Sequence, residues 1–280
     1  MYAFQADANR WRRVNHGQKP PPSIVGDLRV ATYNVWFDPL ESARRCGAVL
    51  DILELEQPDI IALQEVTASF LAALLEAPWV RESYQVSQHK LSPGRHYDVV
   101  MLSRLPVHRA VLHPLPSTMG RRLHMLELRT NRGSLAVAGV HLESMRNMTS
   151  TRLQQIERAI SLLSSADAAI WLGDFNAAPD SSEDALIRTA FSDAWSCLSN
   201  DAGYTRDTTR NAMLAKVKTD RHQRIDRVLT RGGWLVPKSL RLLGTEPLSG
   251  SEGQVFPSDH FGLIGELALP QAQASSAGQA

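Results

Sequence analysis

Four short apolar runs each lead directly into a polar side chain, and this arrangement constrains the fold of the chain more than any other feature. The runs and their side chains are 28–32 with Asn34, 59–63 with Glu65, 135–140 with His141, and 169–172 with Asp174. Short apolar runs of this kind are typical of buried β-strands. The sequence therefore predicts four strand ends that present an Asn, a Glu, a His and an Asp.

Helical patterns lie between these predicted strands. Apolar residues from Cys46 to Leu53 recur at helical spacing, and Pro58 stops that helix before the second strand begins. Residues 153–163 show the same spacing between the third and fourth strands. Strand-like runs also occur at 98–102, 122–128 and 225–229. Helices that alternate with strands on this scale favour a layered α/β fold.

The chain is predicted to form one main domain, residues 27–270, with an extension at each end. Its 280 residues are 43% hydrophobic and 21% charged, which allows a large two-sheet core. Residues 1–26 carry a Pro-rich stretch and scattered Arg, whereas 271–280 are rich in Ala, Gln, Ser and Gly. This tail has too little apolar surface to order itself, so we predict that it is disordered.

Charge, cysteine content and hydropathy narrow the class of protein. A formal net charge of +1 neither demands nor excludes a polyanionic partner. The two cysteines provide no disulfide framework and no paired zinc spacing, which favours a reducing compartment. No run approaches the roughly 18 apolar residues of a membrane span, and the first residues lack the apolar core of a signal peptide. We expect an intracellular protein outside the membrane, in the nucleus of a eukaryote or the cytoplasm of a bacterium.

Two strings carry the strongest chemical signal. In the string WLGDFN, Asp174 and Asn176 are two residues apart and point the same way in an extended segment. The acid suits activation of water, and the amide suits hydrogen bonding to a phosphate oxygen, although an Asx turn is the ordinary alternative. In the string PSDHFG, Asp259 adjoins His260, and Asp226 upstream is a plausible acceptor that orients the imidazole.

Two further strings are as compatible with a structural role as with a functional one. Glu65 lies near the end of an apolar run, where an uncompensated carboxylate is costly to bury and a divalent cation would compensate it. The string HLESMR offers the ring of His141, the hydroxyl of Ser144 and the guanidinium of Arg146. All three side chains are potential donors to phosphate oxygens.

Taken in order, the polar residues resemble the endonuclease/exonuclease/phosphatase superfamily, which includes deoxyribonuclease I. The matching positions are Asn34, Glu65, His141, Asp174, Asn176, Asp226, Asp259 and His260. The resemblance covers nearly all of the chain between its two ends. It implies an α/β (α+β) fold of the deoxyribonuclease I type, a four-layered sandwich in which helices flank two packed mixed β-sheets.

Several stretches look most like the branch that removes tyrosine adducts from 5′ DNA ends, the tyrosyl-DNA phosphodiesterase 2 enzymes. They are 114–118 with the Arg pair at 121–122, then 141–144, 204–208, 237–240 and 257–262. This resemblance implies a nucleic-acid partner, DNA 5′ ends that carry covalent protein adducts, and a monomeric enzyme. Two departures stand out: no arginine follows Asn176, and Arg206 replaces an expected aromatic residue.

The resemblance also implies roles for individual residues. Glu65, Asn34 and Asp259 would hold Mg²⁺, for which Mn²⁺ would substitute, and whether one or two ions bind is open. Asp174 would activate water, and Asp226 would orient His260. The phosphate oxygens would contact Asn176, His141 and His260. Further substrate contacts would come from Ser144, Arg146, Arg122 and Arg206.

Several arginines are candidates for contacts with nucleic acid. A cradle for nucleic acid would draw on arginines at 121, 122, 146, 206 and 210, with others at 10, 12 and 13.

Two other functions compete with removal of tyrosine adducts. One alternative is another phosphoesterase of the superfamily, acting on DNA, RNA, a nucleotide cofactor or a phosphorylated small molecule. A second alternative is a binding module without catalysis. The second is disfavoured because Glu65, Asp174, Asp226 and Asp259 are all present.

Overall fold

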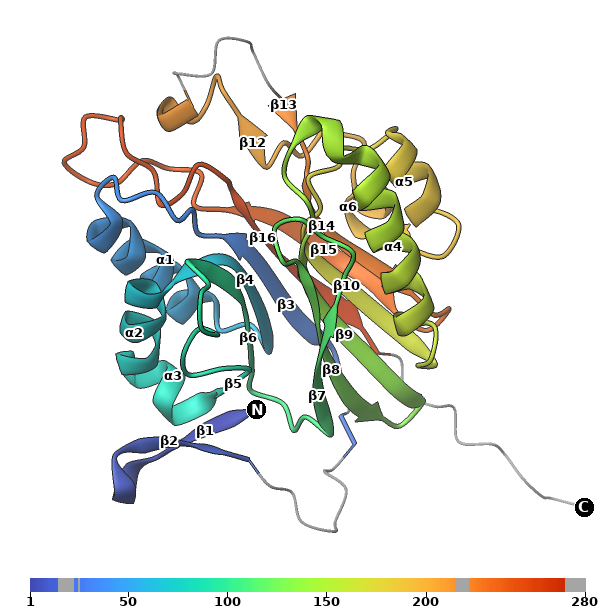
Figure 1. Ribbon diagram of the computed structural model, residues 1–280, viewed down its shortest axis with the longest axis horizontal. Helices are drawn as coiled ribbons and strands as arrows, with labels where there is room; N and C mark the ends of the chain where they lie inside the picture. Colours follow the sequence, from blue (N-terminus) through green and yellow to red (C-terminus); the bar gives the residue numbers. More distant parts are fainter. Residues whose placement is uncertain (15–22, 25, 215–221, 270–280) are drawn as a thin grey trace, which may run out of the picture.

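Two β-sheets pack face to face, and helices cover the outer faces of both (Figure 1). The computed structural model describes residues 1–14, 23–24, 26–214 and 222–269. The predicted disordered tail at 271–280 lies outside these residues. The four-layered α/β sandwich expected from the sequence is confirmed.

The larger sheet has eight strands, and in it β3, from the start of the predicted main domain, pairs with β16, from its end. Its order is β15 (Val236–Leu243), β16 (Gly262–Ala268), β3 (Leu28–Asn34), β4 (Ile60–Thr67), β6 (Tyr97–Ser103), β5 (Gln85–Val86), β1 (Tyr2–Gln5) and β2 (Arg10–Arg13). Strands β3 and β4 are parallel, and the other neighbours are antiparallel.

The smaller sheet has six strands and the same mixed character. Its order is β11 (Ser192–Asp193), β14 (Asp226–Arg231), β10 (Ala168–Asp174), β9 (Gly133–His141), β8 (Arg122–Thr130) and β7 (Arg109–Pro114). Strands β9 and β10 are parallel. A separate two-stranded ribbon pairs β12 (Arg206–Asp207) with β13 (His222–Gln223).

Helices complete the outer layers. The larger sheet is covered by α1 (Ser42–Glu56), α2 (Ala68–Glu76) and α3 (Pro78–Ser83), and the smaller by α4 (Thr149–Leu163) and α5 (Ser182–Ile187). Helix α6 (Ala194–Leu198) packs beside β14 and β15. The short 3₁₀ helices are η1 (Ala6–Ala8), η2 (Arg146–Met148) and η3 (Ala212–Leu214).

Alternation along the strands divides the core into three layers. In β3, Val30 faces the smaller sheet, whereas its neighbour Ala31 faces α1 to α3. In β9, Val137 faces the larger sheet and Ala136 faces α4 and α5. This period of two, with both faces apolar, explains why the central strands read as continuous apolar runs in the sequence.

The N-terminal residues extend the larger sheet. Strands β1 and β2 form a hairpin that joins β5 through the pair Tyr2 and Val86. The side chains of Tyr2 and Trp11 pack against the apolar cluster beneath α2 and α3. The boundary predicted at residue 26 between an extension and a catalytic domain stays a prediction. Within the described residues, no helix is long and apolar enough to cross a membrane.

Candidate active site

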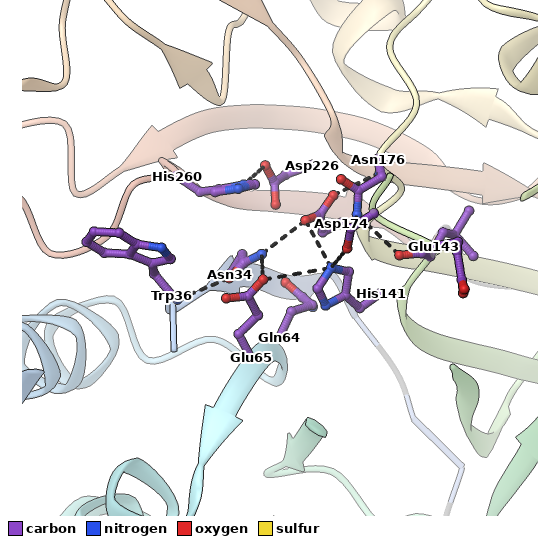
Figure 2. A network of polar contacts seen from close by, with 12 residues as sticks. Asn34, Trp36, Gln64, Glu65, His141, Glu143, Asp174, Asn176, Asp226 and His260 are labelled. Atoms are coloured by element: carbon purple, nitrogen blue, oxygen red, sulfur yellow. Dashed lines mark hydrogen bonds and ion pairs between the residues drawn. The ribbon is translucent and has the colours of Figure 1, made fainter. Parts of the chain in front are cut away.

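The two pairs of parallel strands bring the predicted polar residues to one end of the sandwich. Asn34 is the last residue of β3, His141 of β9 and Asp174 of β10. Strand β14 runs antiparallel to β10, so its first residue, Asp226, lies opposite Asp174. His260 lies just before β16, which pairs with β3. Figure 2 shows these side chains converging from both sheets.

Glu65 enters the site in a way that the sequence did not predict. The strand predicted at 59–63 was expected to end just before this residue, but β4 continues to Thr67. The register shifts between Leu63 and Val66, and Glu65 has a φ of +60°. A β-bulge therefore interrupts the ladder at this point and re-aims the side chain of Glu65. The carboxylate of Glu65 is therefore placed in the site by a bulge within β4 and not by the end of a strand.

Asn34 connects the two central carboxylates. Its Nδ2 donates to Asp174 Oδ2 at 3.0 Å and to Glu65 Oε1 at 3.3 Å. His141 Nε2 lies 3.5 Å from Asp174 Oδ2 and 3.9 Å from Glu65 Oε1. Ser258 Oγ donates to the Asn34 carbonyl at 2.6 Å and so ties the segment before His260 to β3. Five segments that are distant in the sequence thus share one polar network.

Asp226 and His260 form a buried pair. His260 Nδ1 lies 2.7 Å from Asp226 Oδ2. Although burial alone would lower the pKa of His260, the carboxylates of Asp226 and Asp259 raise it to about 10. Asp174, Asp226 and His260 also offer three atoms within 4.8 Å of one another. A protonated imidazole has no free lone pair for a metal, so while His260 stays charged this group can hold a cation only through the carboxylates of Asp174 and Asp226.

Burial also shifts the pKa of three other titratable groups of the centre, Asp174, Glu65 and His141. Burial raises the pKa of Asp174 to about 7, and the charge of Asp226 adds to that effect. Burial also raises the pKa of Glu65. Burial and the charges of Arg121 and His260 lower the pKa of His141 well below its ordinary value. At neutral pH His141 is therefore an uncharged imidazole beside a charged one at His260.

Arg121 reaches the centre from the loop before β8. Its Nη1 lies 3.1 Å from His141 Nδ1, and its Nη2 donates to Ser144 Oγ at 2.7 Å. Asn176 Nδ2 donates to the Leu142 carbonyl at 3.2 Å and lies 3.5 Å from Ser144 Oγ. The sequence marked Arg121 only as one of several basic residues. The structure brings its buried guanidinium into direct contact with the predicted phosphate ligands.

Glu143 holds the loop that carries Arg121, and sequence reasoning gave it no role. Its buried carboxylate accepts hydrogen bonds from Ser117 Oγ at 2.6 Å, from the Thr118 N–H at 2.9 Å and from Gln155 Nε2 at 3.1 Å. Ser117 Oγ accepts in turn from the Arg121 N–H at 2.9 Å. Ser117 and Thr118 were visible in the sequence as possible donors, but their acceptor, Glu143, follows β9, whereas they precede β8.

The other predicted substrate contacts are placed unevenly. Arg206 Nη2 donates to Asp259 Oδ2 at 3.0 Å, so a predicted substrate ligand pairs with a predicted metal ligand. Arg122 pairs with Asp98, and Arg146 is exposed in η2. The arginines at 10, 12 and 13 lie on β2, at the edge of the larger sheet opposite β15. Of the arginines predicted to contact nucleic acid, only Arg121 and Arg206 contact predicted catalytic or metal-binding residues within the described part of the chain.

Two aromatic residues that the sequence reasoning missed support the centre through their backbone. The Trp36 N–H donates to Asn34 Oδ1 at 3.1 Å, and the Phe37 N–H donates to Glu65 Oε2 at 3.0 Å. The ring of Phe37 stacks on Tyr97 with centroids 4.9 Å apart. Asn34 and Glu65 are therefore held from the side of the loop after β3 as well as by each other.

Comparison with known proteins identifies the family. The model of the Endonuclease/Exonuclease/phosphatase family matches residues 31–260, which include every catalytic and metal-binding position discussed above. The chain belongs to this family. The shared fold and the order of the polar residues along the sequence thus have one origin.

The similar proteins point to one branch of the family. Tyrosyl-DNA phosphodiesterase 2 of Bos taurus is 30% identical over 236 residues, which are 79% of this chain and 62% of that protein. The Homo sapiens protein of the same name is 28% identical over 241 residues, 80% of this chain and 63% of that protein. The chain thus spans less than two thirds of the length of these curated relatives.

Solved structures with the same fold include members of that branch and others. A crystal structure of D. rerio TDP2 complexed with a single-strand DNA product has a TM-score of 0.75 at 23% identity, covering 86% of this chain and 98% of that one. A Bacteroides vulgatus endonuclease/exonuclease/phosphatase has a TM-score of 0.69 at 18% identity, covering 87% and 99%. These likenesses show the fold.

The donor set of this family member suits a hard divalent cation. Four carboxylates meet in the site, those of Glu65, Asp174, Asp226 and Asp259, and two cations face them, His260 and Arg206. One oxygen of Asp226 and one of Asp259 are buried without a hydrogen-bond partner among the described residues. Oxygen-rich sites with excess negative charge favour Mg²⁺ or Mn²⁺ over zinc. The residues present therefore fit the expected cofactor.

Proposed function

We propose that this chain is a Mg²⁺-dependent phosphodiesterase that acts on nucleic acid, with 5′-phosphotyrosyl protein–DNA or protein–RNA adducts as its substrate class. The observation that carries this proposal is the convergence of Asn34, Glu65, His141, Asp174 and His260 on one centre. The arrangement joins a general base, neutral and charged phosphate ligands, and an oxygen-rich cation site. Phosphoryl transfer requires these three parts.

Asp174 is suited to take a proton from the attacking water. Its pKa of about 7 in the metal-free protein lies close to the pH at which a general base is most effective. The Asn176 N–H donates to Asp174 Oδ1 at 2.8 Å, and Asn34 donates to Oδ2. With both oxygens held, the carboxylate keeps one orientation toward the substrate. A water hydrogen-bonded to it would lose its proton as the bond to phosphorus forms.

The opposite demand, stabilisation of the developing negative charge, falls to other side chains. Mg²⁺ at Glu65 with Asn34 would supply Lewis-acid stabilisation of phosphate oxygens when bound. His260, kept protonated by Asp226, offers its Nε2, which lies 3.9 Å from Asp259 Oδ1, to a phosphate oxygen. Neutral His141 and Asn176 donate to the same group. Such donors are fixed before the reaction begins, which is where most of their catalytic effect originates.

The substrate class rests on the similar proteins and on the basic side chains beside the centre. Relatives named tyrosyl-DNA phosphodiesterase 2 match along most of this chain, and one D. rerio TDP2 structure holds a single-strand DNA product. Arg121 and Arg206 supply positive charge next to the centre. Arg122 and Arg146 are proposed as outer phosphate contacts. We propose that the enzyme acts as a monomer on DNA 5′ ends.

A substrate panel tests the proposal. The purified chain with Mg²⁺ is assayed on matched oligonucleotides with 5′-phosphotyrosyl or 3′-phosphotyrosyl ends, on abasic DNA, on RNA and on inositol phosphates. The proposal predicts the highest kcat/KM on the 5′-phosphotyrosyl end. Faster turnover of RNA or inositol phosphates would instead assign the chain to another phosphoesterase branch of the family. Turnover of none of them would favour a binding module.

A further inference from the structure

A pocket borders the active site on the side of Glu65 and has no role in the chemistry proposed above. Its volume is about 410 Å³, within the range of small-molecule sites. We call it the Trp36 pocket. Glu65 forms part of its wall, and most of the rest is apolar, including Trp36, Phe37, Leu50 and Phe70. The pocket is therefore continuous with the catalytic centre but differs from it in chemistry.

A buried arginine holds the wall of this pocket in shape. Arg45 on α1 donates to four backbone carbonyls of the loop after β3. These are Val35 at 3.2 Å, Trp36 at 3.2 Å, Asp38 at 2.5 Å and Leu40 at 2.7 Å. Its guanidinium also lies 4.6 Å from the centroid of the Trp36 ring. With the loop pinned to α1, the pocket is formed before any ligand arrives.

The backbone beneath the pocket is unusual for its residues. Trp36 has a φ of +57°, a left-handed conformation that bulky side chains rarely adopt. Its N–H and that of Phe37 donate to Asn34 and Glu65, and both residues line the pocket. The same two residues thus contact the catalytic centre through the main chain and also form part of the pocket wall. Strained residues of this kind cluster at functional sites.

Gly47 supplies the open space of the pocket. It lies inside α1, where glycine destabilises a helix relative to alanine. A Cβ built on Gly47 would meet no atom within 4 Å, so the packing of α1 does not require glycine at this position. Gly47 lines the Trp36 pocket, and a larger side chain there would project into it. The glycine is explained if the volume above it is reserved for a ligand.

We infer that the Trp36 pocket binds the departing group of the substrate, an aromatic side chain such as tyrosine with its flanking residues. This inference rests on the proposed phosphodiesterase function. In an in-line displacement, the attacking and departing oxygens lie on opposite sides of phosphorus. Asp174 marks the side of the attacking water, and Figure 2 shows Trp36 on the opposite side of Asn34. Water adds to phosphorus, its proton passes to Asp174, and the phenolic oxygen departs with the bonding electron pair.

The experiment compares two substrates that differ only in the departing group. One oligonucleotide carries a 5′-phosphotyrosyl end, and the other carries a 5′-phosphodiester to a simple alkyl alcohol. The wild type, Gly47→Leu and Phe37→Ala are assayed with Mg²⁺. Leu55→Ala serves as the control, because Leu55 is also on α1 but is 82% exposed. Dividing each rate by that of the wild type removes the intrinsic difference in reactivity between the two esters.

The inference predicts a change in the ratio of the two kcat/KM values. Gly47→Leu fills the pocket and is expected to lower the tyrosyl-to-alkyl ratio about tenfold or more. Phe37→Ala removes one aromatic contact and is expected to lower it about three- to tenfold. Leu55→Ala is expected to leave it unchanged. Equal losses on both esters would place the nucleotide in the pocket and overturn the inference, as would no loss on either.

A binding measurement separates this inference from the proposed function. Saturation-transfer NMR of N-acetyl-L-tyrosinamide is recorded with metal-free wild type and with metal-free Gly47→Leu. The inference predicts saturable binding to the wild type that is at least about tenfold weaker in Gly47→Leu. Equal binding to both proteins, or none to the wild type, would overturn it. Inactivity of the wild type on both esters would count against the proposed function, and the binding result would still decide the inference.

Discussion

Glu143 is expected to act on catalysis through Arg121, and Glu143→Gln tests this link. Burial alone would raise the pKa of Glu143, but hydrogen bonds from Ser117 and Thr118 hold it below its ordinary value, so the side chain is a carboxylate at neutral pH. The substitution preserves shape and turns one accepting oxygen into a donating NH₂. The new NH₂ then faces another donor, either the Thr118 N–H of the loop or the Gln155 NH₂.

The magnitude follows from the hydrogen bonds at stake. A hydrogen bond to a charged group contributes about 1.5–3 kcal/mol, and Ser117 and Thr118 make such bonds to Glu143 from the loop. Weakening both would reduce the stability of the docked loop by about 2–4 kcal/mol. The loss in kcat/KM cannot exceed the loss caused by removing Arg121 altogether. For one charged transition-state contact, that loss is about 10²-fold. We therefore expect Glu143→Gln to lose between about ten- and 100-fold.

A double-mutant cycle separates this positioning role from a general loss of stability. The assay is kcat/KM on a 5′-phosphotyrosyl oligonucleotide for Glu143→Gln, Arg121→Ala and the double variant, with exposed Glu157→Gln on α4 as the control. If Glu143 acts through Arg121, the double variant loses no more than Arg121→Ala alone. Multiplicative losses in proteins with the same folded spectrum would refute the reasoning.

Three further outcomes are expected. Arg206→Ala should free Asp259, which it holds at 3.0 Å, and strengthen Mn²⁺ binding in a calorimetric titration; unchanged or weaker binding would mean that Arg206 does not compete with the cation. Asp226→Asn removes the carboxylate that raises the pKa of His260 to about 10, so the protonated form should be lost at lower pH. The basic limb of its pH–rate profile should move down relative to the wild type, and an unmoved limb would argue against a protonated His260. Deleting residues 1–13 should lower Tm, because the hairpin packs on the core, while kcat on a small aryl ester stays near the full-length value.

The main part of the fold and the centre of the site follow from local sequence patterns. Short continuous apolar runs predicted β3, β9 and β10, and their last residues, Asn34, His141 and Asp174, were predicted at the strand ends. These assignments depend only on neighbouring residues. Bringing the strand ends together required the resemblance to a known family, because no local pattern states which strands pair.

The features that escaped prediction depend on long-range contacts or on backbone geometry. The bulge at Glu65 requires a register shift against β6, which the β4 sequence alone does not encode. The contact between Glu143 and Ser117 joins residues from different strand ends. Arg206 was expected to meet phosphate, but its partner in the protein is Asp259, far along the sequence. The N-terminal hairpin is short and lacks a clear alternation.

The central claim is that a carboxylate base and a bound divalent cation hydrolyse a phosphodiester in this site. The most direct measurement is turnover of a 5′-phosphotyrosyl oligonucleotide by the wild type, Asp174→Asn and Glu65→Gln, each with Mg²⁺ and with EDTA. We predict turnover by the wild type with Mg²⁺ only, and losses of about 10²-fold or more in both folded variants. Turnover that persists in EDTA, or near-wild-type rates in both variants, would contradict the account.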